Sequence, residues 1–141
     1  MTDWLGIAIV AAVLYGLHQV FTRLAAGHIG EGLGAFVVES SAAAFVLAYL
    51  AYQRVTNHAT QPATSAGVGW SVLTGLCVGA GTIAFFVLFQ RGGPLSAVPM
   101  ILAGGAALMA VAGFTLFHEP ITLRTLLGIA FALVGLYLLR S

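Results

Sequence analysis

The residues best suited to chemistry are one carboxylate and one polar stripe, both inside apolar stretches. Glu39 is the only acid well inside such a stretch. An ionisable group costs ~2.5–3.5 kcal/mol at the centre of a bilayer, so a residue of this kind is a functional candidate by default. Tyr15, His18, Gln19 and Thr22 recur at steps of three and four residues, which places them on one face of a helix.

His18 and Glu39 are expected at the same depth. Each lies about four residues from the middle of its predicted helix, which is ~6 Å from the midplane at 1.5 Å of rise per residue. We therefore predict a cavity between the first two helices, where Glu39 binds a cation or exchanges a proton. His18 and Gln19 would be its hydrogen-bond partners, and Tyr15 would be an aromatic wall that can meet a cation.

A purely structural role for Glu39 is equally open at this point. A protonated Glu39 that is hydrogen-bonded to His18 or Gln19 would fix helix packing and do nothing else, because polar pairs between membrane helices are common. The two interpretations differ in whether the carboxylate meets a solute.

Signals of an enzyme are lacking in the sequence. His, Cys and acidic residues do not occur at metal-ligand spacing, and no Ser, His and Asp share one depth. Cys77 is the single cysteine, so a disulfide within the chain is excluded. A net charge of +1 offers nothing for nucleic acid to bind. We expect a carrier without a metal or cofactor.

The composition is that of an integral membrane protein. Of 141 residues, 60% are hydrophobic and 6% are charged, and the mean hydropathy is +1.05. Too few charges are present to cover a water-facing surface. A helix needs ~20 apolar residues to cross the bilayer. On that basis the sequence predicts one all-α domain over 1–141, a bundle of five transmembrane helices at 3–25, 32–53, 68–90, 95–117 and 122–139.

The last two predicted helices form an antiparallel hairpin, and small residues predict how it packs. Gly104 and Gly105 on one helix, with Gly128 and Gly135 on the other, would let the backbones approach closely. Pro99 is one turn into the fourth stretch, where it would act as a hinge that kinks the helix or frees a carbonyl.

The turn between these helices contains a predicted helix cap. Thr122 is the expected N-cap of the last helix, and Glu119 stands close before it. A negative charge near a helix N-terminus is stabilised by the helix dipole. We prefer a capping role for Glu119.

The order of these motifs resembles one half of an EamA-type member of the drug/metabolite transporter superfamily. The resemblance consists of Arg91, the helix that contains Pro99, Glu119, the triplet Leu127-Gly128-Ile129, and Gly135. Leu5–Ala51 fits the opening helix pair of that family. His118 departs from it, since such hairpins usually have Gly before the acid of the turn. Larger members contain two such halves, so the resemblance implies a half-size transporter.

Charge does not specify one orientation in the membrane. Five helices would place Arg54 and Arg124 on one side, and Arg23, Arg91 and Arg140 on the other. Orientation follows the Lys and Arg bias, and here that bias is slight. A chain that inserts both ways could pair with an inverted copy of itself as a homodimer. A single orientation, or pairing with a sister half, is the alternative.

These observations predict a multi-pass transporter of the cytoplasmic membrane, surrounded by the lipid bilayer. It would move a small organic solute, either a metabolite or a drug-like amphipathic cation, by alternating access as a dimer or with a second half. The competing prediction is a non-transporting membrane subunit that assembles with a larger carrier or a flippase for lipid-linked groups.

Overall fold

The described chain is helical. A computed structural model of the protein describes residues 3–56, 62–118, 120 and 122–138, and no strand occurs among them. Four helices are long and apolar enough to cross a membrane, which indicates a multi-pass membrane protein. The chain divides into two compact units, Met1–Gly92 and Gly93–Ser141.

The helix bounds agree closely with the apolar stretches of the sequence. The elements are α1 (Asp3–Ala25), α2 (Glu31–Val55), α3 (Ser65–Gln90), the 3-10 turn η1 (Leu95–Ala97), α4 (Val98–Leu116) and α5 (Leu123–Leu138). The largest difference is at α3, which begins before the predicted residue 68. Thr64 explains this start, because its side-chain oxygen accepts a hydrogen bond from the Gly67 N–H at 3.1 Å. Such a bond satisfies one of the free N–H groups of the first turn.

The count of five spans stays a prediction. The described part of α5 has 16 residues, which is about 24 Å of helix. That is shorter than the ~30 Å of bilayer hydrocarbon. The spans supported by helix length and hydropathy are α1, α2, α3 and the segment Leu95–Leu116.

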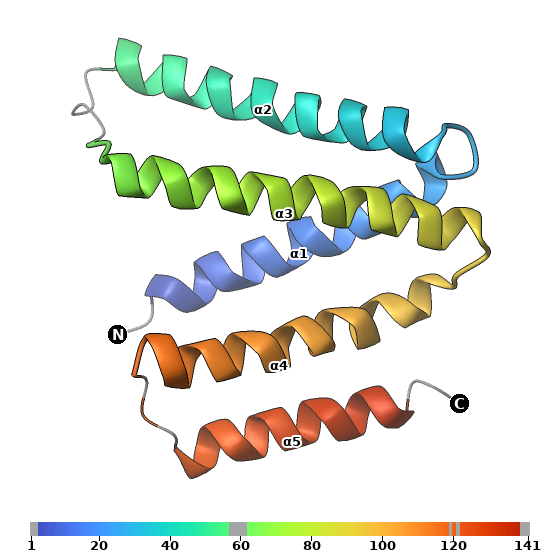
Figure 1. The fold of residues 1–141 in the computed structure, drawn as a ribbon, viewed down its shortest axis with the longest axis vertical. Coiled ribbons are helices and arrows are strands. Elements are labelled where there is room, and N and C mark those ends of the chain that lie inside the picture. Colours follow the sequence, from blue (N-terminus) through green and yellow to red (C-terminus); the bar gives the residue numbers. More distant parts are fainter. Residues whose placement is uncertain (1–2, 57–61, 119, 121, 139–141) are drawn as a thin grey trace. The chain divides into compact units, whose positions relative to one another are not determined.

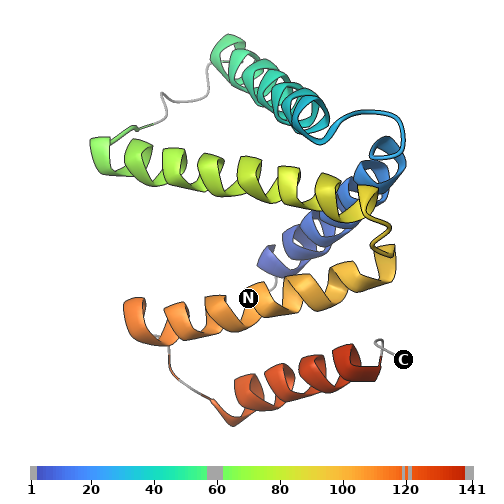
Figure 2. The same ribbon diagram turned by 45° about the vertical axis from the view of Figure 1, so that its right-hand side comes forward.

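In the first unit, three helices meet at one end. α2 and α3 lie side by side, and α1 approaches α3 where α1 ends, α2 begins and α3 ends (Figures 1 and 2). The buried residues of this unit all lie at that end: Gln19, Thr22, Ala26, Gly34, Ala35, Thr82, Phe86 and Phe89. The buried polar groups and the tightest packing of this unit therefore occur together.

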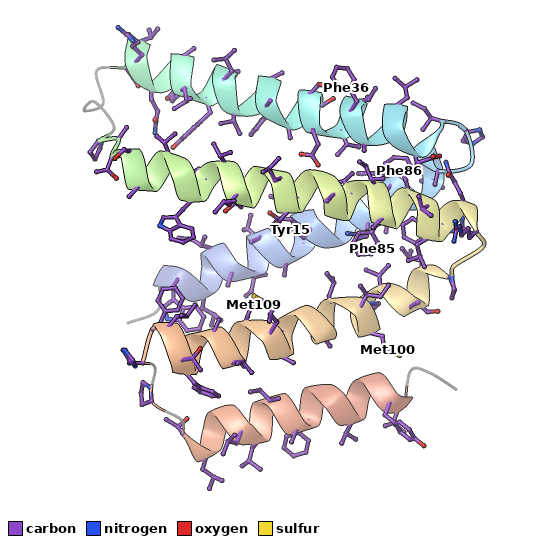
Figure 3. All side chains as sticks on the ribbon, viewed as in Figure 1. Tyr15, Phe36, Phe85, Phe86, Met100 and Met109 are labelled. Carbon is purple, nitrogen blue, oxygen red and sulfur yellow. The ribbon has the colours of Figure 1, made fainter. Side chains whose placement is uncertain are left out.

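The close contact between α2 and α3 is made at Gly34. A Cβ atom added there would lie 2.5 Å from Cε1 of Phe86, a ring that is fully buried. Phe86 lies between α2 and α3, whereas Phe36 points away from α3 (Figure 3). Gly75 and Gly79, whose spacing predicts close helix contacts in α3, would meet no atom within 4 Å. The close approach of α2 and α3 is therefore made at Gly34 and not at these two glycines.

The second unit contains the glycines that are predicted to pack in the hairpin of α4 and α5. Gly104, Gly105, Gly128 and Gly135 are exposed, and a Cβ at any of them would meet no atom within 4 Å. α4 and α5 are in contact and lie side by side (Figure 1), and within the described part of the hairpin no atom lies close to these glycines. Small residues permit close packing without requiring it.

Pro99 starts α4 instead of bending it. The proline lies in the first turn of the helix, where its missing N–H has no helical acceptor to lose. The turn before it, Leu95–Ala97, has 3-10 geometry. The chain therefore changes from a 3-10 turn to an α-helix at Val98, one residue before the proline.

The turn after α4 contains a residue in the left-handed backbone conformation. His118 has a φ of 52°, and no other non-glycine residue described has a positive φ. Glycine adopts this left-handed conformation without strain, whereas other residues seldom do. Thr122 occupies the N-cap position of α5, because its carbonyl accepts the first helical hydrogen bond, from the Leu126 N–H at 3.1 Å. Glu119 lies outside the described residues.

Replacing His118 with glycine should stabilise the protein by about 1 kcal/mol, since it removes the strain of the left-handed conformation. Unfolding in mixed detergent micelles measures the change. The matched control is His28→Gly, a loop histidine with an ordinary negative φ, which should give no gain. A loss of stability in His118→Gly would show that the histidine side chain is needed at this turn.

Candidate binding site in the first unit

The site is built around a hydrogen bond between two helices. The Oγ1 atom of Thr82 on α3 lies 2.6 Å from Oε1 of Glu39 on α2. Thr82 is buried and Glu39 is partly buried. The same hydroxyl lies 3.0 Å from the carbonyl oxygen of Val78, one turn back on α3. The carboxyl group of α2 thus faces a neighbouring helix of the protein.

The hydrogen bond of Glu39 is made with a residue other than the two expected from the sequence. No hydrogen bond joins Glu39 to His18 or Gln19 in the described chain, and the acid is paired with Thr82 instead. Nδ1 of His18 and Oε1 of Gln19 are buried and have no hydrogen-bond partner among the described residues. The hydrogen bond of Glu39 therefore joins α2 to α3.

The depth argument could have found Thr82. Glu39 lies about four residues before the middle of α2, and Thr82 lies between four and five after the middle of α3. Because α2 and α3 run in opposite directions, both residues lie about 6–7 Å from the middle of their helices, towards the same side. Two consecutive antiparallel helices follow α1, and the depth of Glu39 alone does not show which neighbour it faces.

The residues of the polar stripe on α1 differ in their burial. Gln19 and Thr22 are buried, with exposed fractions of 8% and 2%, and His18 is partly buried. The Thr22 hydroxyl donates to the carbonyl oxygen of His18 at 2.8 Å. Tyr15, however, is 70% exposed. It does not line the buried part of the site, so its predicted role as an aromatic wall is not supported by its position.

The observed contact between a cation and an aromatic ring involves Arg23 and Phe89. Nη1 of Arg23 donates to the carbonyl oxygen of Phe89 at 3.1 Å, and the guanidinium carbon lies 5.6 Å from the centroid of the Phe89 ring. A cation at the C-terminal end of a helix is stabilised by the helix dipole. The sequence suggests Arg91 for this role at the end of α3, but the cation bound to a carbonyl there comes from α1.

A second hydrogen bond joins the end of α3 to the loop between α1 and α2. Nε2 of Gln90 donates to the carbonyl oxygen of Ile29, in the loop between α1 and α2, at 2.9 Å. This bond and the bond from Arg23 hold α1, its following loop and the end of α3 together. The Glu39–Thr82 pair lies about two turns deeper in the same unit.

The arrangement offers acceptors and one ionisable acid. α3 contains no Asp, Glu, Lys or Arg, and the nearest cationic group on α1, Arg23, is bound to the end of α3. No group of three or more His, Cys, Asp and Glu that could hold a metal ion occurs among the described residues. The chemistry available at Glu39 is therefore proton exchange and the binding of a group that carries positive charge or donates hydrogen bonds.

Comparison of the chain with protein-family models, with curated proteins and with solved structures finds no match.

Proposed function

We propose that the protein is a half-size membrane transporter for a small organic solute, working as a dimer or with a second half. The observation that carries the proposal is Glu39, an acid within the membrane-spanning helix α2 that faces Thr82 of α3. Insertion of such a group is costly, and ionisable residues that face the interior of a helix bundle are typical of solute and proton pathways. The resemblance to EamA-type half transporters supports the same function.

The proposed substrate is a metabolite or an amphipathic cation. Glu39 supplies a negative charge when it is ionised, and Oε1 of Gln19 is a buried acceptor that has no partner in the described chain. Buried acceptors left without a donor are unfavourable, so a solute that donates hydrogen bonds fits this part of the unit. Movement of the solute would follow alternating access, with the site exposed to each side in turn.

One observation favours the competing function, a non-transporting membrane subunit. The 2.6 Å bond between Glu39 and Thr82 is itself a good interhelical contact, and such contacts can serve packing alone. In that case the protein would assemble with a larger carrier, and Glu39 would meet no solute.

The proposal is tested by reconstituting the protein in lipid vesicles with a pH gradient and adding a panel of metabolites and amphipathic cations. Solute-dependent movement of protons through the wild-type chain is the expected result. A membrane subunit without transport activity should leave the gradient as stable as in empty vesicles with every solute.

We further propose five membrane spans, insertion in a cytoplasmic membrane, and an inverted homodimer. The near balance of arginines on the two sides supports dual insertion. Reporter domains fused to each terminus should each give signals from both faces of the membrane. A signal from a single face for each terminus would establish one fixed orientation and would favour a sister half as the partner.

A further inference from the structure

We propose that Thr82 is a positioning residue that holds the Glu39 carboxyl group in both of its protonation states. The inference rests on one hydroxyl group with two acceptors. Oγ1 of Thr82 lies 2.6 Å from Oε1 of Glu39 and 3.0 Å from the carbonyl oxygen of Val78. A threonine hydroxyl has a single proton to donate, and it can also accept. It therefore cannot make both bonds fully as a donor.

When Glu39 is ionised, its oxygens can only accept hydrogen bonds. The Thr82 hydroxyl then donates its proton to Oε1, and the 2.6 Å separation fits a short charge-assisted O–H···O⁻ bond. The contact with Val78 is given up in this state. The Val78 carbonyl still has its helical N–H donor, so it is not left without a partner.

When Glu39 takes up a proton from water, the direction of the bond reverses. The new carboxylic O–H donates to Oγ1 of Thr82, and the Thr82 hydroxyl rotates to donate to the Val78 carbonyl at 3.0 Å. One proton is gained by the carboxyl group, and no other covalent bond forms or breaks. Both states therefore keep the contact between the two oxygens, and α2 and α3 need not separate when the charge changes.

No other charged side chain of the neighbouring helix competes for this role. The titratable group on α3 is the exposed thiol of Cys77. On α1, which packs against α3, the groups near this depth are His18, which has no hydrogen bond to Glu39, and Arg23, which is bound to Phe89. Among the described residues, Thr82 is thus the side chain that is hydrogen-bonded to the acid.

The experiment compares Thr82→Val, Thr82→Cys and Thr82→Ser in membranes. The primary measurement is the infrared absorbance of the protonated Glu39 carboxyl group as a function of pH, assigned by its loss in Glu39→Gln. Valine has no hydroxyl, so the hydrogen bond to the Glu39 carboxyl group is lost, and the profile should differ from that of the wild type. Serine should restore the wild-type profile, and cysteine, a weak donor of similar size, should fall between.

The matched control is Thr74→Val on the same helix. The Thr74 hydroxyl also bonds to a carbonyl one turn back, that of Trp70 at 3.0 Å, but it meets no acid in the described chain. This variant should leave the profile unchanged. A wild-type profile in both Thr82→Val and Thr82→Cys would overturn the proposal.

The inference deepens the proposed transport function, and the two can fail separately. The infrared profile needs no solute and no transport. A shifted profile in Thr82→Val, together with a wild-type chain that moves no solute, would support the role of Thr82 and refute transport. If transport occurs, its pH dependence should move with the infrared profile.

Discussion

Glu39→Gln is expected to reduce proton-coupled solute uptake at least tenfold in reconstituted vesicles, while the protein still inserts and folds. Glutamine keeps the side-chain shape and a carbonyl oxygen that can accept from the Thr82 hydroxyl, so the contact between α2 and α3 is retained. It can neither lose nor gain a proton at neutral pH, so the step that couples solute to proton movement is removed. Initial uptake rates at saturating pH gradient measure the effect.

Glu31→Gln is the matched control for this experiment. Glu31 is the acid in the first turn of α2 and is exposed, so its replacement removes the same charge from the same helix without touching the site. We expect uptake within about twofold of wild type, since the remaining effect is a helix-dipole interaction at the surface. Equal uptake by Glu39→Gln and wild type would remove Glu39 from the mechanism and favour the non-transporting subunit.

Gly34→Ala is expected to destabilise the first unit by about 1–3 kcal/mol. The added methyl group would lie 2.5 Å from the ring of Phe86, so either the ring or the helix must move, and overpacking of this kind typically has that cost. The usual gain from alanine in a helix, up to about 1 kcal/mol, does not compensate. Unfolding in mixed micelles, together with the yield of inserted protein, measures the loss.

Two further variants separate packing from helix propensity. Gly32→Ala lies on the same helix, where a Cβ would meet nothing within 4 Å, and it should be neutral or slightly stabilising. Phe86→Leu combined with Gly34→Ala should recover part of the loss, because the smaller side chain makes room for the methyl group. Equal stabilities of Gly32→Ala and Gly34→Ala would show that α2 and α3 do not pack at this point.

The positions of the helices could be predicted from the sequence because a membrane-spanning helix requires only a long apolar stretch. A stretch of ~20 apolar residues can satisfy its backbone inside lipid as a helix. The first two predicted spans, 3–25 and 32–53, differ from α1 and α2 by two residues or fewer at each end. The start of α3 was missed because Thr64, a residue outside the apolar stretch, caps the helix.

Helix partners could not be predicted in the same way. Gly75, Gly79, Gly104 and Gly105 occur in patterns that permit close contacts, yet the close approach is made at Gly34. In a membrane helix both the contact face and the lipid face are apolar, so hydropathy does not distinguish them. The packing of α2 on α3 in the structure shows that Gly34 is the glycine in contact with the Phe86 ring.

The hydrogen-bond partner of Glu39 could not be predicted from the sequence either. The depth of Glu39 follows from helix length, and on depth alone His18 and Thr82 are equal candidates for its partner. The choice between them depends on which neighbouring helix α2 packs against, and the structure selects α3. Tyr15 shares the polar stripe of α1 but is 70% exposed, because α1 meets α3 only near its C-terminal end (Figure 2).

The central claim is that Glu39 is held against Thr82 of α3 inside the membrane-embedded unit. Crosslinking in native membranes tests it most directly, in a Cys77→Ser background with Glu39→Cys paired with Thr82→Cys, Thr74→Cys or His18→Cys. A short thiol-to-thiol reagent should join the pair at 39 and 82 in high yield and should join the other two pairs poorly. Equal yields for the three pairs, or a higher yield for 39 with 18, would contradict the contact between α2 and α3 on which the site is built.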